Sequence, residues 1–92
     1  MIISFKDKDS ALLASGVRVK RFEAFERIAY RKIRQLQIAA SLNDLQIPPG
    51  NRLEALSGKR KGQYSIRIND QYRICFVWTP AGPAEVEITD YH

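Results

Sequence analysis

Three segments near the C-terminal end alternate apolar and polar residues, and short turn sequences separate them. They span residues 63–68, 72–78 and 84–89; Asn69-Asp70 fills the first gap and a stretch with Pro and Gly, 79–83, fills the second. A period of two is typical of strands with one buried face, and these segments are rich in β-branched and aromatic residues. The alternation therefore predicts a three-stranded antiparallel meander.

A second pattern, of helical period, precedes these strands. From Phe22 to about Ala40, apolar residues recur at steps of three and four, which predicts a helix with one buried side. Three arginines lie on its other side; a solvated face is their simplest interpretation, and docking on an acidic partner or RNA is the alternative. Residues 2–5 predict a short strand and residues 11–14 a short helix, whereas the Pro-Gly stretch within 41–51 predicts a loop.

Length and composition limit the class of protein. With 92 residues, the chain can bury one core, so we expect a single α+β domain spanning residues 1–92. The net charge of +5 favours nucleic acid or an acidic protein as a partner. The single cysteine excludes an internal disulfide, and no apolar run approaches the ~20 residues of a membrane span. We therefore expect a cytoplasmic protein with no membrane contact.

The alternation also fixes a register for the predicted sheet. Keeping the apolar residues on one face pairs Ile66 with Ile74, Arg67 with Arg73, Ile74 with Ile88, Phe76 with Val86, and Arg73 with Thr89. Tyr91 would then lie diagonal to Arg73, about 7–8 Å away by sheet geometry. Arg67, Arg73 and Tyr91 are thus expected on the face that does not pack on the helices, which we call the outer face.

Two arginines opposite each other on neighbouring strands repel, so Arg67 and Arg73 call for a compensating anion. A phosphate would serve, but Glu87, diagonal to Arg73, could equally neutralise it as an ordinary surface ion pair. The pattern leaves both interpretations open. A basic turn before the sheet is by itself a solvated loop, but it would extend a phosphate path toward Arg67; its residues are Lys59, Arg60 and Lys61.

The chain ends with Asp90-Tyr91-His92, and His92 is its only histidine. A frayed terminus is one interpretation. The other is functional, because imidazole transfers protons near neutral pH, an aromatic ring can stack on a base, and guanidinium groups bind phosphate. Asp90 falls on the core side by parity and would mainly position its neighbours. Together with Arg73, this tail supplies the groups needed to cleave RNA.

Two other reactive side chains have less specific patterns. Asn51 and Glu54 have capping-box spacing, so Glu54 is expected to cap a short helical turn, and we retain it as a second candidate for proton transfer. Cys75 falls on the outer face, but its predicted neighbours Ser65 and Glu87 include no activating base. A nucleophilic role for Cys75 is therefore not expected.

Four segments together resemble a known family: NRLEALSG at 51–58, GQYSIR at 62–67, NDQYRICF at 69–76, and the terminal DYH. They are similar to the HigB family of bacterial toxins in the RelE-like superfamily, especially its GraT-like members. The resemblance is specific over residues 51–92, and the predicted N-terminal elements agree in order and length. It implies a RelE-like fold, in which an N-terminal strand and two helices pack on a twisted antiparallel sheet completed by the C-terminal meander.

The resemblance also implies an activity and partners. The family cleaves messenger RNA in the A site of the 70S ribosome, by attack of the ribose 2′-hydroxyl on the adjacent phosphate, with no metal or other cofactor. The expected inhibitor is a HigA-like antitoxin with a helix-turn-helix domain, through which the toxin would reach operator DNA.

The resemblance assigns roles to individual residues. Arg73 matches the family arginine that stabilises the charged transition state, and Asp90, Tyr91 and His92 match the functional C-terminal trio. Many relatives have histidine where Glu54 stands here. The base could therefore be Glu54, or His92 acting with Asp90, or the enzyme could be weaker.

Two rivals come from other functional classes. ParE-like toxins use the same scaffold to poison DNA gyrase without RNA cleavage, and they usually lack a terminal acid-Tyr-His group. A non-enzymatic module that binds RNA or the ribosome would need only the basic charge.

Overall fold

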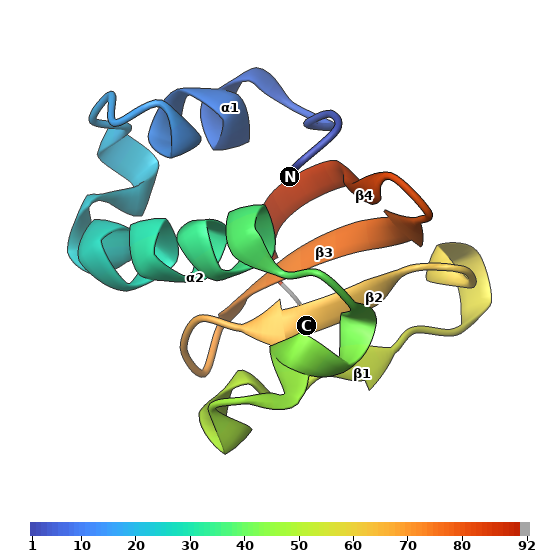
Figure 1. The fold of residues 1–92 in the computed structure, drawn as a ribbon. Coiled ribbons are helices and arrows are strands. Elements are labelled where there is room, and N and C mark those ends of the chain that lie inside the picture. Colours follow the sequence, from blue (N-terminus) through green and yellow to red (C-terminus); the bar gives the residue numbers. More distant parts are fainter. Residues whose placement is uncertain (91–92) are drawn as a thin grey trace.

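The computed structural model describes residues 1–90, and two helices lie across one face of a four-stranded antiparallel sheet (Figure 1). The strand order β1-β2-β3-β4 follows the sequence, which is the α+β arrangement that the sequence predicted. The helices are α1 (Lys8–Ala14) and α2 (Glu26–Ile38), and the strands are β1 (Glu54–Ala55), β2 (Tyr64–Arg67), β3 (Tyr72–Thr79) and β4 (Gly82–Asp90). Four 3-10 turns connect them: η1 (Lys20–Phe25), η2 (Leu42–Gln46), η3 (Pro49–Asn51) and η4 (Gly58–Arg60).

The helix predicted from Phe22 to Ala40 is shorter than expected, because α2 begins at Glu26 and η1 precedes it. In a 3-10 turn, residues three apart lie on the same side, so Phe22 and Phe25 both point into the core. The Phe25 ring lies 4.4 Å from that of Tyr72, centroid to centroid. Packing against the sheet thus explains why the apolar pattern extends beyond the α-helix.

The loop predicted over residues 41–51 contains two 3-10 turns. Ser41 and Asp44 form a capping box at the start of η2, and the backbone N–H groups of Ala40 and Ser41 lower the pKa of the Asp44 carboxyl. Asn51, at the end of η3, is fully buried, and its Nδ2 donates to Gln35 Oε1 at 2.9 Å and to the Leu45 carbonyl at 3.1 Å. The segment is held by side-chain hydrogen bonds, which periodicity does not reveal.

The strand predicted at residues 2–5 is wrong as a regular strand, because only a single parallel bridge, Phe5 to Val86, is present. The Ile3 N–H donates to the Pro83 carbonyl at 2.7 Å, and the Lys6 N–H donates to the Val86 carbonyl at 3.0 Å. Glu85 has a positive φ of 53° next to this bridge, so β4 is too irregular there for a longer ladder. The N-terminal segment nevertheless runs along the side of β4 that does not pair with β3.

The predicted register is confirmed along most of the meander. Ile66 pairs with Ile74, Arg67 with Arg73, Ile74 with Ile88, and Arg73 with Thr89. The predicted pair of Phe76 with Val86 is wrong as a regular pair, since a bulge shifts the register between Cys75 and Val77. Phe76 and Val86 are still both buried in the core, so the bulge alters the ladder and keeps the apolar face.

The core lies between the helices and the sheet. Its fully buried members include residues from both layers: Phe22, Ala29, Leu36, Ile66, Ile74, Phe76 and Val86. Among the described residues, no helix is long and apolar enough to cross a membrane.

Candidate functional site

Arg73 is held across the outer face of the sheet by two neighbouring segments. Its Nε donates to Ser65 Oγ at 2.7 Å, and its Nη2 donates to the Arg52 carbonyl at 2.8 Å. Ser65 is fully buried on β2, and Arg52 lies just before β1, so the guanidinium reaches from β3 over β2 toward β1. These bonds fix the position of a cation on the outer face.

Arg67 lies opposite Arg73 in the ladder, but its side chain bonds in another direction. Its Nε donates to the Asn69 carbonyl at 3.1 Å, and its Nη2 forms an ion pair with Asp70. Both acceptors lie in the turn between β2 and β3. The repulsion expected between the two arginines is therefore reduced by separate acceptors, and the structure does not bring the two guanidinium groups onto one common acceptor among the described residues.

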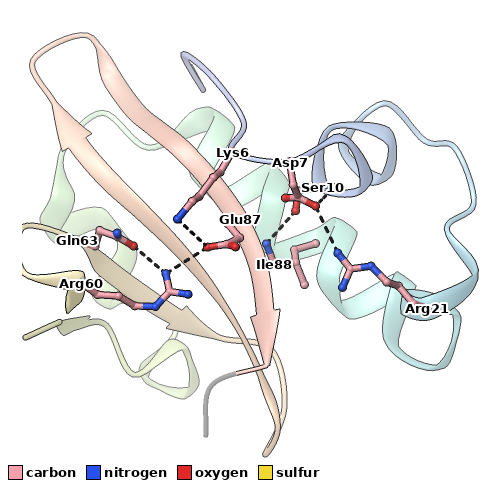
Figure 2. Close-up of polar contacts among 8 residues, drawn as sticks. All are labelled: Lys6, Asp7, Ser10, Arg21, Arg60, Gln63, Glu87 and Ile88. Carbon is pink, nitrogen blue, oxygen red and sulfur yellow. Dashed lines mark hydrogen bonds and ion pairs between the residues drawn. The ribbon is translucent and has the colours of Figure 1, made fainter. Parts of the chain in front are cut away.

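Glu87 lies on the outer face between two other cations (Figure 2). Arg60 Nη1 lies 3.2 Å from the Glu87 carboxylate and Lys6 Nζ 3.8 Å from it. Arg60 also donates to Gln63 Oε1 at 3.1 Å. Glu87 thus forms ion pairs with Arg60 and Lys6. One interpretation of the sequence had instead paired it with Arg73.

The basic turn is divided between the sheet and the solvent. Arg60 is partly buried against the outer face, whereas Lys59 and Lys61 are exposed. The sequence patterns did not single out Lys6, because its place depends on the single bridge between the N-terminal segment and β4. That bridge joins residues far apart in the chain and leaves no local signal.

Cys75 lies beneath these charges and is fully buried. Burial raises the pKa of its thiol, the Glu87 carboxylate raises it further, and the cations Arg60, Arg73 and Lys6 oppose the increase. A thiol with a raised pKa is a poor nucleophile at neutral pH. The raised pKa agrees with the expectation that Cys75 is not a nucleophile.

Glu54 is part of strand β1, so the predicted helical cap is wrong. The φ of Arg52 is 47°, a left-handed conformation that ends η3 and turns the chain into β1. Glu54 pairs with Ser65, which puts both residues on the same face, and it is exposed. Since Ser65 accepts the Arg73 hydrogen bond, Glu54 shares the face on which Arg73 is anchored.

The start of the C-terminal trio lies at the end of β4. Asp90 pairs with Tyr72 in the ladder, and Gln71 Nε2 donates to Asp90 Oδ2 at 2.8 Å. Tyr72 packs on Phe25 and Phe22, so the register gives Asp90 the core-side parity that the sequence predicted. Tyr91 and His92 lie outside the described residues, and their predicted roles remain predictions.

Known proteins share this sequence and fold. A family model described as "RelE-like toxin of type II toxin-antitoxin system HigB" matches residues 15–92. Toxin HigB-1 of Vibrio cholerae serotype O1 is 41% identical over 80 residues, which cover 85% of this chain and 84% of that protein. The chain belongs to the HigB family.

Two further proteins are similar to this chain. An uncharacterized protein of Haemophilus influenzae is 40% identical over 50 residues, which are 54% of this chain and 50% of that protein. The YoeB-YefM complex from Staphylococcus aureus contains a chain with a TM-score of 0.62 and 18% identity, covering 100% of this HigB-family chain and 98% of that one. The second likeness confirms the RelE-like fold.

This HigB-family protein is therefore a toxin of a type II toxin-antitoxin system, as the resemblance implied. RelE-like toxins are endoribonucleases as a class, and a toxin of this type has an antitoxin partner. The matched region includes the sheet, Glu54, both arginines and the terminal trio, so all candidate residues fall within the family part of the chain.

Proposed function

We propose that this toxin cleaves messenger RNA in the A site of the 70S ribosome, by attack of a ribose 2′-hydroxyl on the adjacent phosphate. The products would be a cyclic phosphate and a 5′-hydroxyl. The observation that carries the proposal is Arg73, a cation fixed on the outer face by Ser65 Oγ and the Arg52 carbonyl. Cleavage of this kind places extra negative charge on the phosphate, and a preorganised cation stabilises that charge.

Proton transfer requires a base for the 2′-hydroxyl and an acid for the leaving oxygen. We assign Glu54 as a candidate base, because it is an exposed carboxylate on the face where Arg73 is anchored. His92 is the candidate acid, Tyr91 would stack on or orient the nucleobase, and Asp90 would position both. In the alternative, His92 acting with Asp90 is the general base, and Glu54 takes no part in the chemistry.

Binding of the RNA backbone would use the remaining cations. Arg67 is the proposed second phosphate ligand, reached when RNA competes with its surface ion pair to Asp70. Arg60, Lys59 and Lys61 would extend the positive path along the outer face. The bacterial ribosome would align the substrate, which an active site with so few catalytic groups needs.

The proposed partners follow from this role. A HigA-like antitoxin with a helix-turn-helix domain would inhibit the toxin and carry it to operator DNA. The solved neighbour is itself a complex, YoeB with YefM, which supports an antitoxin partner of some kind. We place the protein in the cytoplasm, because its proposed substrate is translated there.

Mapping of messenger RNA 5′ ends after brief expression tests the proposal. We expect new ends within seconds to minutes at positions set by the reading frame, and none with Arg73→Ala. Expression of Arg34→Ala, which removes an exposed arginine of α2, is the matched control and should give the wild-type ends. Growth arrest with DNA breaks and no new RNA ends would instead identify a gyrase poison.

A further inference from the structure

A hollow of about 340 Å³ lies where α2 faces residues 48–50 and the turn after β2. Three cations line it: Arg31 and Lys32 from α2, and Arg67 from β2. Ile28 and Pro48 contribute apolar surface. Arg67 thus belongs to this hollow as well as to the ladder pair with Arg73, which gives it a role that the sheet register alone does not suggest.

Two other hollows of the described surface have a different charge pattern. The one between α1 and α2 contains Arg18 and Arg27, but the carboxylate of Glu26 lies in the same lining and pairs with Arg18 at 2.9 Å. The one beyond the end of α2 contains Asp44 and no cation. The lining of the Arg67 hollow, by contrast, includes no carboxylate. Asp70 reaches Arg67 from outside with a side chain that is 96% exposed, which makes a weak surface pair.

The amides in this lining also present donors. Gln35 Oε1 accepts from Asn51 Nδ2 at 2.9 Å, and Asn69 Oδ1 accepts from the backbone N–H groups of Gln71 and Tyr72. Because these oxygens are used internally, each amide can offer a ligand its NH₂ group. The polar side chains of the hollow are therefore guanidinium, ammonium and amide donors, the set that binds phosphate oxygens.

Lys32 is held in place despite the repulsion of the neighbouring Arg31. Lys32 Nζ donates to Oδ1 of the buried Asn51, so its position is fixed. Burial, together with the charge of Arg31, lowers the pKa of the Lys32 ammonium. An anion bound between Arg31 and Lys32 would remove this repulsion and favour the charged form of Lys32.

We propose that this hollow is a second binding site for an RNA phosphate, separate from the phosphate at Arg73. The proposal rests on the proposed function, since RNA is the polyanion that such a toxin meets. Continuity favours RNA over an acidic protein segment: Arg67 is the register partner of Arg73 and also lines the hollow, so a single RNA strand would contact Arg73 and the hollow through neighbouring phosphates. The phosphate could come from messenger RNA or from ribosomal RNA.

The first test uses the isolated protein and needs no cleavage. An isotope-labelled Arg73→Ala toxin is titrated with a short single-stranded RNA at low salt and followed by amide chemical shifts. We expect the largest shifts at residues 31–32, 50 and 67–69. Shifts confined to the rest of the outer face would overturn the proposal. So would equal shifts of the same amides by a polyglutamate peptide, which would indicate a protein-binding surface.

Charge-matched variants make the test quantitative. Arg31→Gln with Lys32→Gln should reduce the slope of log affinity against log salt by about 0.7 for each phosphate that the variant no longer binds. Arg27→Gln with Arg34→Gln removes the same charge from side chains outside the hollow and should change the slope less. Because Lys32 bonds a buried residue, Arg31→Gln alone is the fallback if the double variant unfolds. An equal decrease of the slope in the control pair would overturn the proposal.

Ribosome binding distinguishes the two sources of phosphate. Weaker binding of Arg31→Gln to empty and messenger-loaded ribosomes alike indicates ribosomal RNA, and weaker binding only to loaded ribosomes indicates messenger RNA. Unchanged affinity for both overturns the proposal. If the wild type fails to cleave but RNA still shifts the hollow amides, the proposed function fails and the site stands. If the wild type cleaves but RNA does not shift the hollow amides, the second phosphate site is overturned and the proposed function stands.

Discussion

Arg73 and Arg67 are partners in the same strand ladder, yet their surroundings differ in kind. Arg73 is bonded to Ser65 Oγ and to the Arg52 carbonyl, acceptors that come from other segments of the sheet. Arg67 is bonded to the Asn69 carbonyl and to Asp70, within three residues of itself. One arginine is fixed by the tertiary structure, and the other is held by its own turn.

This difference suggests a division of work. A cation that must stabilise a transition state is most effective when the fold fixes it before the substrate arrives, as with Arg73. A cation held by an exposed ion pair can exchange that partner for a phosphate at little cost, as with Arg67. The comparison teaches that two arginines paired in one register can differ in what holds them, and from that difference we propose chemistry for Arg73 and RNA binding for Arg67.

The largest effect is expected at Arg73. Arg73→Ala should lower the cleavage rate about 1,000-fold and abolish growth inhibition, because the developing phosphate charge loses its fixed cation. Single-turnover cleavage on messenger-loaded ribosomes measures this, with circular dichroism to confirm folding. Undiminished cleavage by a folded Arg73→Ala protein would remove the central role of this residue.

Glu54 should come next, if it is the base. Glu54→Gln keeps the shape and removes the proton acceptor, so the cleavage rate should fall about 100-fold. Glu85→Gln, which neutralises another exposed carboxylate, is the control and should cleave as the wild type does. A rate for Glu54→Gln within about twofold of wild type would assign the base role to His92 with Asp90 instead.

Ser65 tests whether the anchoring of Arg73 matters. Ser65→Ala removes the acceptor at 2.7 Å from Arg73 Nε and should reduce the maximal cleavage rate by about tenfold, the kinetic equivalent of one hydrogen bond. If Ser65 acts only by positioning Arg73, the ribosome concentration for half-maximal rate should stay the same. Ser57→Ala is the exposed control. A change in half-saturation with an unchanged maximal rate would contradict the positioning role.

The smallest effect is expected on the pKa of the Cys75 thiol. This pKa should respond differently to the loss of Arg73 and of Arg67, and no substrate is needed to measure it. The charge of Arg73 lowers the pKa of the Cys75 thiol, so Arg73→Ala should raise that pKa further above its ordinary value. Arg67→Ala should leave it nearly unchanged. The pH dependence of the Cys75 ¹³Cβ chemical shift in the folded protein measures both, because it needs no access of a reagent to the buried thiol. An equal shift in the Arg67 variant would show that the two guanidinium groups occupy one electrostatic site.

The sheet was predictable because its register depends on a simple repeated pattern. Ile66, Ile74 and Ile88 must share the buried face, and that requirement alone pairs Arg67 with Arg73. The family could also be predicted, because four motifs match together. Non-local contacts were not predictable: the N-terminal bridge at Phe5 depends on the edge of β4, which no local pattern encodes.

Side-chain direction was the other limit. Periodicity gives the face of Arg67 but not the acceptors that turn its guanidinium toward Asn69 and Asp70. Glu54 was misread as a cap because its spacing from Asn51 fits a capping box, whereas Asn51 is fully buried and bonds Gln35. Local spacing therefore located the candidate residues. It did not predict the contacts of their side chains, because those contacts depend on tertiary packing.

The division of work between the arginines can be measured directly. Single-turnover cleavage by Arg73→Ala and by Arg67→Ala is followed over a range of messenger-loaded ribosome concentrations, which separates the maximal rate from half-saturation. We predict that Arg73→Ala lowers the maximal rate, whereas Arg67→Ala raises the half-saturating concentration and leaves the maximal rate within a few-fold of wild type. Equal decreases of the maximal rate in both variants would contradict the account.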